Sequence, residues 1–274
     1  MSFRYYMFKQ KFAVTTARNV KGKLIEAAKA WAEELHVPYV ARHKNETLEE
    51  LLAEHELDAF IIAKVKGAEV YSAAGNFGYH PNMAALRILE MQRGAQDNYV
   101  EALGLHAGSR VLDCTLGLAA DAAVASYVVG ATGRVVGVEA SPLVHFAVQY
   151  GLAHYVTKYP WFDEALRRIE TFNAVADDYL QQLISTRTTE ADLFDVVYFD
   201  PMFHHGVKGS LAMDALRPIS YEKPLEEATI QLALQIAPKV VIKERSEFHL
   251  QEYGCEEFFG GKSSRVKFGF RYRK

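Results

Sequence analysis

The sequence has few cysteines and no long apolar run. Its two cysteines, Cys114 and Cys255, exclude a disulfide-stapled scaffold and leave no four-cysteine zinc site. No apolar stretch approaches the roughly 20 residues that a membrane-spanning helix needs. Arg4, Lys9 and Lys11 interrupt the apolar residues of the N-terminus, a pattern unlike that of a signal peptide. We therefore expect a cytoplasmic protein that does not act on or in a membrane.

Acidic residues are absent from both ends of the chain. Residues 1–23 and 262–274 together carry twelve Lys and Arg side chains and no Asp or Glu. The residues between them hold 19 basic and 34 acidic side chains, a balance of −15. A basic surface built from both ends would suit a polyanion, of which nucleic acid is the usual one. The alternative is that the two basic ends are solvated and never meet in space.

Length and composition favour a globular protein with one large core. Half of the 274 residues are hydrophobic and 24% are charged, proportions that exclude a disordered chain. A single core rarely exceeds about 250–300 residues, so we expect a large domain with an appendage. Residues 1–95 are predicted to form this appendage, a small α+β domain. It is expected to contain helices at 23–35 and 82–93, a short strand at 37–42 and a hairpin within 59–73.

Residues 96–274 have the pattern of an α/β domain. Short apolar strands with helical segments between them are predicted at 109–116, 133–141, 167–175, 193–202 and 239–245. Strands of this kind are buried on both faces by the intervening helices, which indicates a doubly wound, mostly parallel sheet. The alternating segment 265–273 is expected to close the sheet as an edge strand.

Acidic residues stand where the predicted strands end. Asp113 ends the first strand and Glu139 the second, and a loop containing Gly117 leads into the first helix. Ligands of parallel sheets bind at the carboxyl ends of the strands, and the start of a helix offers free backbone N–H groups. An acid after the second strand can accept hydrogen bonds from two ribose hydroxyls. The alternative for Asp113 and Glu139 is a helix cap or a surface acid.

Two short segments carry a resemblance. The loop after the first strand reads DCTLGLAAD from Asp113, and the fourth strand is followed by DPMF from Asp200. On these segments, region 109–274 resembles the class I S-adenosylmethionine-dependent methyltransferases. Within them it is similar to the bacterial small-subunit ribosomal RNA guanine-N2 methyltransferase family. Three further matches to that family are Lys208 with Ser210, the strand end Val241, Lys243 and Arg245, and the segment GKSSR at 261–265.

The resemblance implies a seven-stranded Rossmann-like sheet and S-adenosylmethionine as the cofactor. The loop from Asp113 to Gly117 would face its methionine part, Asp121 its ammonium and Glu139 its ribose, and Asn173 would flank its adenine. The cofactor-binding residues expected on this basis are Asp113, Thr115, Leu116, Gly117, Asp121, Glu139, Ala140, Ser141, Asn173 and Ala174.

Asp200, Pro201 and Phe203 are the expected catalytic residues. The Asp200 carboxylate and the Pro201 carbonyl can accept the N–H bonds of an exocyclic amine and so orient its lone pair, while Phe203 can stack on a base. The resemblance adds five substrate-binding residues, namely His204, Lys208, Ser210, Lys243 and Arg245. The three cations among them are alternatively ordinary strand-end charges. Adjacent histidines without nearby partners at ligand spacing suit a metal poorly, so no metal site is expected.

Three functions remain open from the sequence. We expect an enzyme that transfers a methyl group from S-adenosylmethionine to an exocyclic amine of guanine, in ribosomal RNA or the small ribosomal subunit. The first alternative is an N-methyltransferase of a small-molecule or protein amine. The second is a non-catalytic RNA-binding module with a methyltransferase fold, which would not bind S-adenosylmethionine. The sequence does not fix the oligomeric state.

Overall fold

The structure is a computed structural model that describes residues 10–20, 22–65, 67–189, 191, 193–201, 219–220, 223–261 and 266–274. The described chain divides into two compact units. The first unit contains residues 10–80, 141–155 and 219–220, and the second contains the other described residues. The predicted domain boundary at residue 95 stays a prediction.

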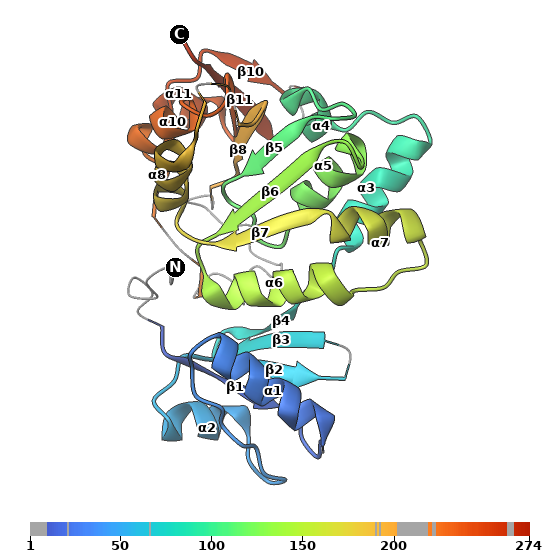
Figure 1. Ribbon diagram of the computed structural model, residues 1–274, viewed down its shortest axis with the longest axis vertical. Coiled ribbons are helices and arrows are strands. Elements are labelled where there is room, and N and C mark those ends of the chain that lie inside the picture. Colours follow the sequence, from blue (N-terminus) through green and yellow to red (C-terminus); the bar gives the residue numbers. More distant parts are fainter. Residues whose placement is uncertain are drawn as a thin grey trace. The chain divides into compact units, whose positions relative to one another are not determined.

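The first unit is built on a four-stranded sheet in the order β1-β2-β3-β4 (Figure 1). Its elements are β1 (Phe12–Thr16), α1 (Lys23–Glu34), α2 (Leu48–Glu54), β2 (Ala59–Lys64), β3 (Gly67–Ser72), β4 (Gly75–Gly78) and α6 (Pro142–His154). Strands β1 and β2 are parallel, and the β2–β3 hairpin predicted over 59–73 is present. The expected strand at 37–42 is reduced to an isolated bridge between Val14 and Tyr39.

Helices cover both faces of the small sheet. Alternation along β1 and β2 turns Ala13 and Phe60 towards Leu51 of α2, where they form an apolar cluster. Helix α1 packs on β1 and β2, and α6 packs on β3. Trp31 of α1 joins the two helices, because its ring meets Phe146 and Tyr150 of α6 edge-on at 5.2 and 4.8 Å between centroids. Aromatic contacts of this geometry stabilise a core beyond the area that they bury.

The second unit is an α/β domain whose seven-stranded sheet has the order β10-β11-β9-β8-β5-β6-β7. Its strands are β5 (Arg110–Asp113), β6 (Arg134–Glu139), β7 (Ile169–Asn173), β8 (Val196–Phe199), β9 (Lys239–Glu244), β10 (Glu257–Phe259) and β11 (Lys267–Tyr272). Its helices are α3 (Asn82–Gln92), α4 (Asn98–Leu103), α5 (Ala120–Val129), α7 (Pro160–Arg167), α8 (Ala176–Thr186), α10 (Glu227–Ala233) and α11 (Glu247–Glu252).

The five central strands are parallel, as the apolar strand pattern predicts. The expected Rossmann-like methyltransferase sheet, with seven strands and a separate small N-terminal sheet, is therefore confirmed. One detail of the prediction is wrong. Strand β11 falls within the predicted segment 265–273, but it lies between β9 and the three-residue strand β10, which is the edge strand.

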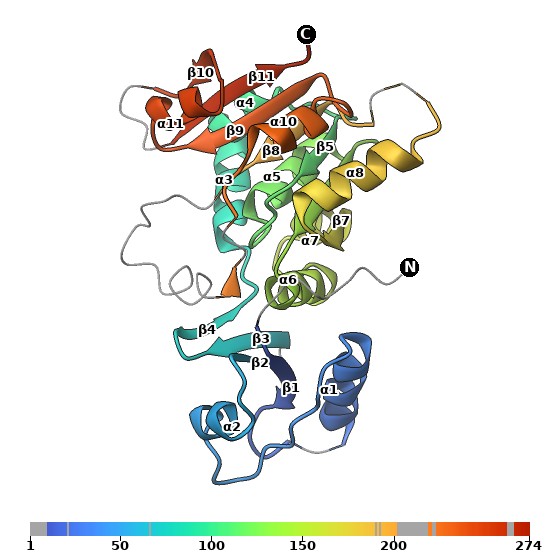
Figure 2. The same ribbon diagram turned by 90° about the vertical axis from the view of Figure 1, so that its left-hand side faces the viewer.

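Helices lie on both faces of the large sheet, as Figures 1 and 2 show. Helices α8, α10 and α11 enclose one core cluster against the sheet, which includes Leu112, Val197 and Ile242. Helices α3, α4 and α7 pack around α5, which contacts strands β5, β6 and β7. Within the described part of the chain, none of the helices has both the length and the apolar composition to span a membrane.

Candidate active site

Four acidic or amide residues converge at one edge of the large sheet. Asp113 ends β5, Glu139 ends β6, Asn173 ends β7, and Asp200 directly follows β8. Because these strands are parallel, all four residues lie at the end where the strands terminate, which we call the carboxyl edge. The opposite end is called the amino edge. The carboxyl edge is where sheets of this kind bind their ligands.

The loop between β5 and α5 is held against β6. The Leu116 N–H donates to the Val138 carbonyl at 3.0 Å, and the Leu116 side chain lies over Gly137. A Cβ at Gly137 would stand 2.4 Å from a Leu116 methyl carbon, so any larger residue there would displace the Leu116 side chain. Gly117 and Ala119 both have left-handed backbones, with φ of 49° and 58°. Alanine costs about 1–2 kcal/mol in this conformation, which glycine tolerates freely.

Glu139 ties the loop to the end of β7. Its carboxylate accepts the Gly117 N–H at 3.0 Å. The backbone carbonyl of Glu139 accepts bonds from the Asn173 side chain at 2.8 Å and from the Ala174 N–H at 3.1 Å. The Asn173 amide also donates to the Ala140 carbonyl at 3.1 Å. Five of the residues expected to bind the cofactor are thus connected by hydrogen bonds.

Thr115 links the loop to the predicted catalytic segment. Its backbone N–H donates to the Asp113 carboxylate at 3.0 Å. Its hydroxyl accepts the Asp200 N–H at 2.6 Å. Glycine at position 115 would leave the Asp200 N–H without this acceptor. The threonine side chain therefore positions the backbone at Asp200.

A chain of ion pairs runs beneath the same edge. Arg87 of α3 forms two hydrogen bonds with Asp97, at 2.8 and 2.9 Å, and one with Asp121 of α5 at 2.5 Å. Asp121 also accepts bonds from the Tyr198 hydroxyl at 2.8 Å and from the Lys243 ammonium at 2.9 Å. Lys243 donates in addition to the Asp200 carboxylate at 2.7 Å. Charge-assisted pairs of this length are the strongest hydrogen bonds in proteins.

The carboxylates of this chain differ in proton affinity. Burial raises the pKa of Asp200 to about 6, although the neighbouring Lys243 charge opposes the rise. Burial also raises the pKa of Asp113 to about 8, against the Thr115 N–H bond. At Asp121 burial is outweighed by the charges of Lys243 and Arg87, which bring its pKa down to about 2. At neutral pH the cluster holds ionised Asp97, Asp121 and Asp200 against two cations, and thus one net negative charge.

Arg87, Asp97 and Tyr198 were not predicted from the sequence to belong to the site. For Tyr198, the alternation of side chains along β8 and β9 was a signal that could have found it. Tyr198 and Asp200 share one face of β8, and Lys243 lies on the corresponding face of β9, opposite the residues of the α8 cluster. No comparable signal marks Arg87, whose partners lie 10 and 34 residues further along the chain.

The other predicted site residues are distributed as follows. Pro201 follows Asp200, while Phe203, His204, Lys208 and Ser210 lie outside the described residues. Ser141 is buried, and its hydroxyl accepts the Val144 N–H at the start of α6. Arg245 is exposed just beyond β9, and its backbone N–H donates to the Glu244 carboxylate.

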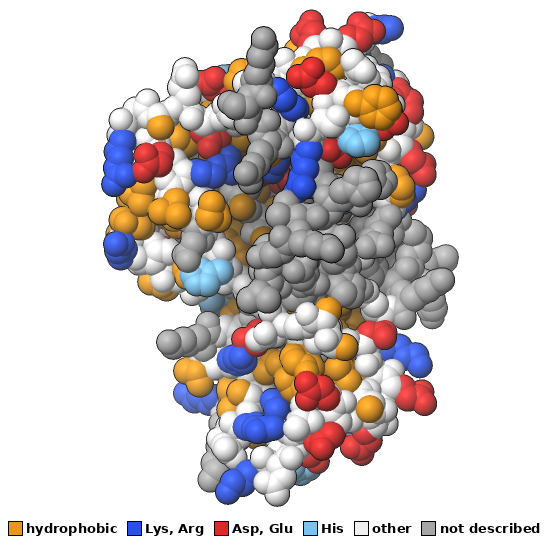
Figure 3. All heavy atoms as spheres, turned by 180° about the vertical axis from the view of Figure 1, so that it is seen from behind, with side chains coloured by type: hydrophobic (Ala, Val, Ile, Leu, Met, Phe, Trp, Pro, Cys, Tyr) orange, Lys and Arg blue, Asp and Glu red, His pale blue; other side chains and the backbone are white. Residues whose placement is uncertain are grey.

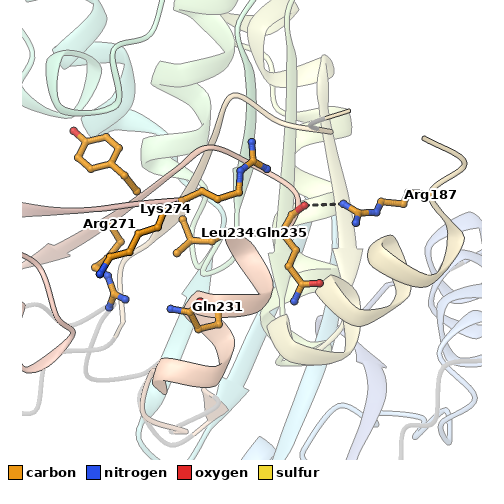
Figure 4. A pocket seen from close by; sticks show the side chains of 8 residues that line it. Arg187, Gln231, Leu234, Gln235, Arg271 and Lys274 are labelled. Carbon is orange, nitrogen blue, oxygen red and sulfur yellow. Dashed lines mark hydrogen bonds between the residues drawn. The ribbon is translucent and has the colours of Figure 1, made fainter. Parts of the chain in front are cut away.

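The C-terminal cations Arg271, Arg273 and Lys274 lie at the amino edge and not at the carboxyl edge. A groove of about 620 Å³ is lined there by Arg187, Gln231, Leu234, Gln235, Arg271, Tyr272, Arg273 and Lys274 (Figure 4). Tyr272 pairs with Lys239, the first residue of β9, which fixes the groove at the edge opposite Asp200. Arg271 is held by Glu227 through two bonds of 2.8 Å, and Arg187 by the Gln235 carbonyl at 2.7 Å. On the face drawn in Figure 3, basic and acidic side chains of the described residues are interspersed.

Comparison with known proteins decides the family. A family model described as "Putative SAM-dependent methyltransferase" matches residues 50–266. The chain belongs to this family of S-adenosylmethionine-dependent methyltransferases. It is 37% identical over 230 residues to the uncharacterised protein YpiP of Bacillus subtilis (strain 168), covering 84% of this chain and 86% of YpiP.

Two further comparisons are informative. The chain is 32% identical over 164 residues to ribosomal RNA small subunit methyltransferase J of Aeromonas salmonicida (strain A449). That match covers 57% of this chain and 60% of the relative. The crystal structure of a SAM-dependent methyltransferase from Neisseria gonorrhoeae is similar over 95% of both chains, with a TM-score of 0.60 and 17% identity. The likeness to the Neisseria gonorrhoeae structure shows that the two proteins share a fold.

The protein is therefore a methyltransferase that uses S-adenosylmethionine, and the residues of the carboxyl edge fit this cofactor. The net negative charge of Asp97, Asp121 and Asp200 against Arg87 and Lys243 suits a ligand that carries a sulfonium and an ammonium. A carboxylate at the end of the second parallel strand, here Glu139, suits a ribose. Asp113, Thr115, Gly117, Glu139 and Asn173 are the residues that would hold it.

Proposed function

We propose that this methyltransferase modifies an exocyclic amine of guanine in small-subunit ribosomal RNA. The observation that carries the proposal is the Asp200 carboxylate, which lies at the carboxyl edge and is bound there by the Lys243 ammonium, while the Thr115 hydroxyl accepts the backbone N–H of Asp200. The aligned similarity to two ribosomal RNA small subunit methyltransferases supports the substrate class. An enzyme with this substrate would act in the cytoplasm.

The chemistry asks for orientation more than for a strong base. An exocyclic amine has its lone pair delocalised into the base until its two N–H bonds are fixed by acceptors. The Asp200 carboxylate and the Pro201 carbonyl are suitable acceptors and would leave the nitrogen lone pair directed at the methyl donor. S-adenosylmethionine supplies an electrophilic methyl group on a sulfonium whose positive charge disappears on transfer.

The charge of the site changes in step with this reaction. As the amine nitrogen bonds to the methyl carbon, positive charge develops on the nitrogen. The Asp200 carboxylate is placed to stabilise that charge, which is the largest contribution that a preorganised site usually makes. The nitrogen then loses its proton. Because the pKa of Asp200 is raised to about 6 by burial, the carboxylate is ionised at neutral pH yet able to take up a proton transiently.

A second candidate substrate is an amine of a small molecule or protein. The position of the C-terminal cations favours it, because Arg271, Arg273 and Lys274 lie at the amino edge, away from Asp200. These cations therefore add no phosphate-binding charge next to the proposed catalytic residue.

Nucleoside mass spectrometry of small-subunit ribosomal RNA separates the two candidates. RNA from a strain lacking the protein should contain less N2-methylguanosine than RNA from the parent. Expression of the intact chain should restore the methylated nucleoside, whereas the Asp200→Ala variant should not. Unchanged N2-methylguanosine in the deletion strain would contradict the proposed RNA substrate and favour the small-molecule or protein amine.

A further inference from the structure

We propose that Lys243 is a positioning residue that holds the Asp200 carboxylate ionised and turned for catalysis, and is not a contact for substrate phosphate. The proposal rests on the proposed role of Asp200 as the acceptor for the substrate amine. Lys243 and Asp200 are joined by a hydrogen bond of 2.7 Å. Both side chains are largely buried, with 19% and 26% of their surface exposed.

The register of the sheet brings the two residues together. Phe199, the last residue of β8, pairs with Ile242 of β9, so Asp200 and Lys243 occupy the next position on adjacent strands. Phe199 and Ile242 both face the core cluster under α8 and α10. Because successive side chains of a strand alternate between faces, Asp200 and Lys243 both turn to the opposite face, where α5 lies.

A second carboxylate, that of Asp121, also binds the Lys243 ammonium and holds it inside the protein. Asp121 accepts a bond from it at 2.9 Å and is itself fixed by Arg87 and by the Tyr198 hydroxyl. Asp97 binds Arg87 in turn through two bonds. The ammonium of Lys243 is thus bound to two buried carboxylates, and both raise the pKa of Lys243 well above its ordinary value. An ammonium bound in this way is poorly placed to bind a phosphate group.

Removing the Lys243 charge would leave Asp200 among like charges. The other charged and titratable groups that act on it from the neighbouring elements are Asp113, Asp121, Tyr198 and Glu244. Asp121 and Glu244 both raise the pKa of Asp200, and Lys243 is the cation that lowers it. Without Lys243, Asp200 would hold its proton to a higher pH, and the neutral carboxyl group would be a weaker acceptor for the N–H bonds of the amine.

Carbon-13 NMR of aspartate-labelled protein tests this without any substrate. The Asp200 carboxyl signal, assigned by its loss in Asp200→Asn, should titrate at higher pH in Lys243→Met than in the unmodified protein. Lys239→Met is the matched control, because Lys239 is a half-buried lysine of the same strand that binds the Ala102 carbonyl at the amino edge. It should leave the Asp200 titration unchanged. An equal titration in Lys243→Met and the unmodified protein would overturn the proposal.

Methyl transfer to small-subunit RNA from the deletion strain gives a second readout. In Lys243→Met we expect kcat to fall at least about tenfold at pH 6.5 and to recover as the pH rises to 9, because alkali ionises Asp200 again. The KM for RNA should stay unchanged, and Lys243→Arg should restore most of kcat. An equal loss at every pH, or a raised KM with normal kcat, would refute the positioning role.

These two experiments separate the proposal from the proposed function. If the unmodified protein fails to methylate the RNA, the proposed substrate is wrong, and the NMR titration still decides the role of Lys243. Should Lys243→Met not fold, Lys243→Gln, which keeps a hydrogen-bond donor but no charge, provides the same comparison in both experiments. The same upward shift of the Asp200 titration is expected for it.

Discussion

The two edges of the large sheet use charge in different ways. At the carboxyl edge, Asp121 and Lys243 are about four-fifths buried or more and are bound to each other and to further charged partners. At the amino edge, the pair Arg110–Asp195 leaves 43% and 44% of the two side chains exposed. The amino-edge groove likewise has exposed cations at its rim.

This difference shows which charges the fold depends on. An exposed ion pair contributes about 0–1 kcal/mol, because water and salt screen it. A buried pair gives little net stability as a whole, but removing one partner leaves an uncompensated charge at a cost of about 3–5 kcal/mol. The carboxyl edge therefore holds its side chains in one arrangement, whereas the amino edge tolerates change. A site that must orient an amine needs the first kind of surface.

The largest expected effect comes from removing Arg87. Arg87→Met would leave Asp97 without its cation and Asp121 with Lys243 alone, so the free energy of unfolding should fall by about 3–5 kcal/mol. Urea denaturation measures the loss. Arg110→Met removes an arginine from the exposed pair at the amino edge and should cost about 1 kcal/mol or less. Equal losses of unfolding free energy in the two variants would contradict the difference between the two edges.

A smaller effect is expected on cofactor binding when Glu139 is removed. Glu139→Ala deletes the carboxylate assigned to the ribose and the acceptor of the Gly117 N–H. Affinity for S-adenosylmethionine should weaken by about 1–3 kcal/mol, measured by isothermal titration calorimetry. The control is Glu170→Ala. Glu170 lies on the neighbouring strand β7 and forms an exposed ion pair with Arg134 of β6, so its removal should leave the affinity unchanged. Unaltered binding in Glu139→Ala would exclude this carboxylate from the cofactor site.

A further effect concerns the pH dependence of stability. The folded-state pKa of Asp113 is raised to about 8 by burial, so folding takes up a proton between its ordinary pKa and that value. The contribution of Asp113 to stability is therefore fully present below about pH 4 and is lost as the pH rises to 8. Asp113→Asn keeps the acceptor for the Thr115 N–H and removes the proton uptake.

The free energy of unfolding of Asp113→Asn, followed by urea denaturation from pH 5 to pH 8, tests this assignment. The free energy of unfolding of the variant should decline less with pH than that of the unmodified protein and exceed it at pH 8. Parallel pH profiles for the two proteins would mean that Asp113 is ionised throughout this range.

Much of the fold follows from the sequence because the apolar runs are unambiguous. Strands β5, β6, β8 and β9 each fall within a predicted strand, and their parallel arrangement places Asp113, Glu139 and Asp200 at one edge. The position of β11 was predicted wrongly, because β10 is only three residues long and two of them are partly buried. A strand of that length leaves no periodic signal.

The ion-pair chain was the least predictable part of the site. It joins α3, α5, β8 and β9. Directly bonded partners are separated by up to 122 residues in the sequence, so no local spacing connects them. The resemblance suggested that Lys243 contacts substrate and that Asp121 pairs with the cofactor's ammonium. In the structure, both oxygens of Asp121 already accept bonds from side chains of the protein. Alternation along β8 and β9 could have paired Asp200 with Lys243, but nothing in the sequence singles out Arg87.

The most direct test of the account measures turnover and cofactor affinity together in Asp200→Ala. Small-subunit ribosomal RNA from cells lacking the protein is the substrate, and S-adenosylmethionine binding is measured by calorimetry on the same preparation. If Asp200 orients the amine, methyl transfer should fall by at least about a hundredfold while cofactor affinity stays within a factor of about three. Methyl transfer at the unmodified rate would show that the carboxyl edge does not use Asp200 in catalysis.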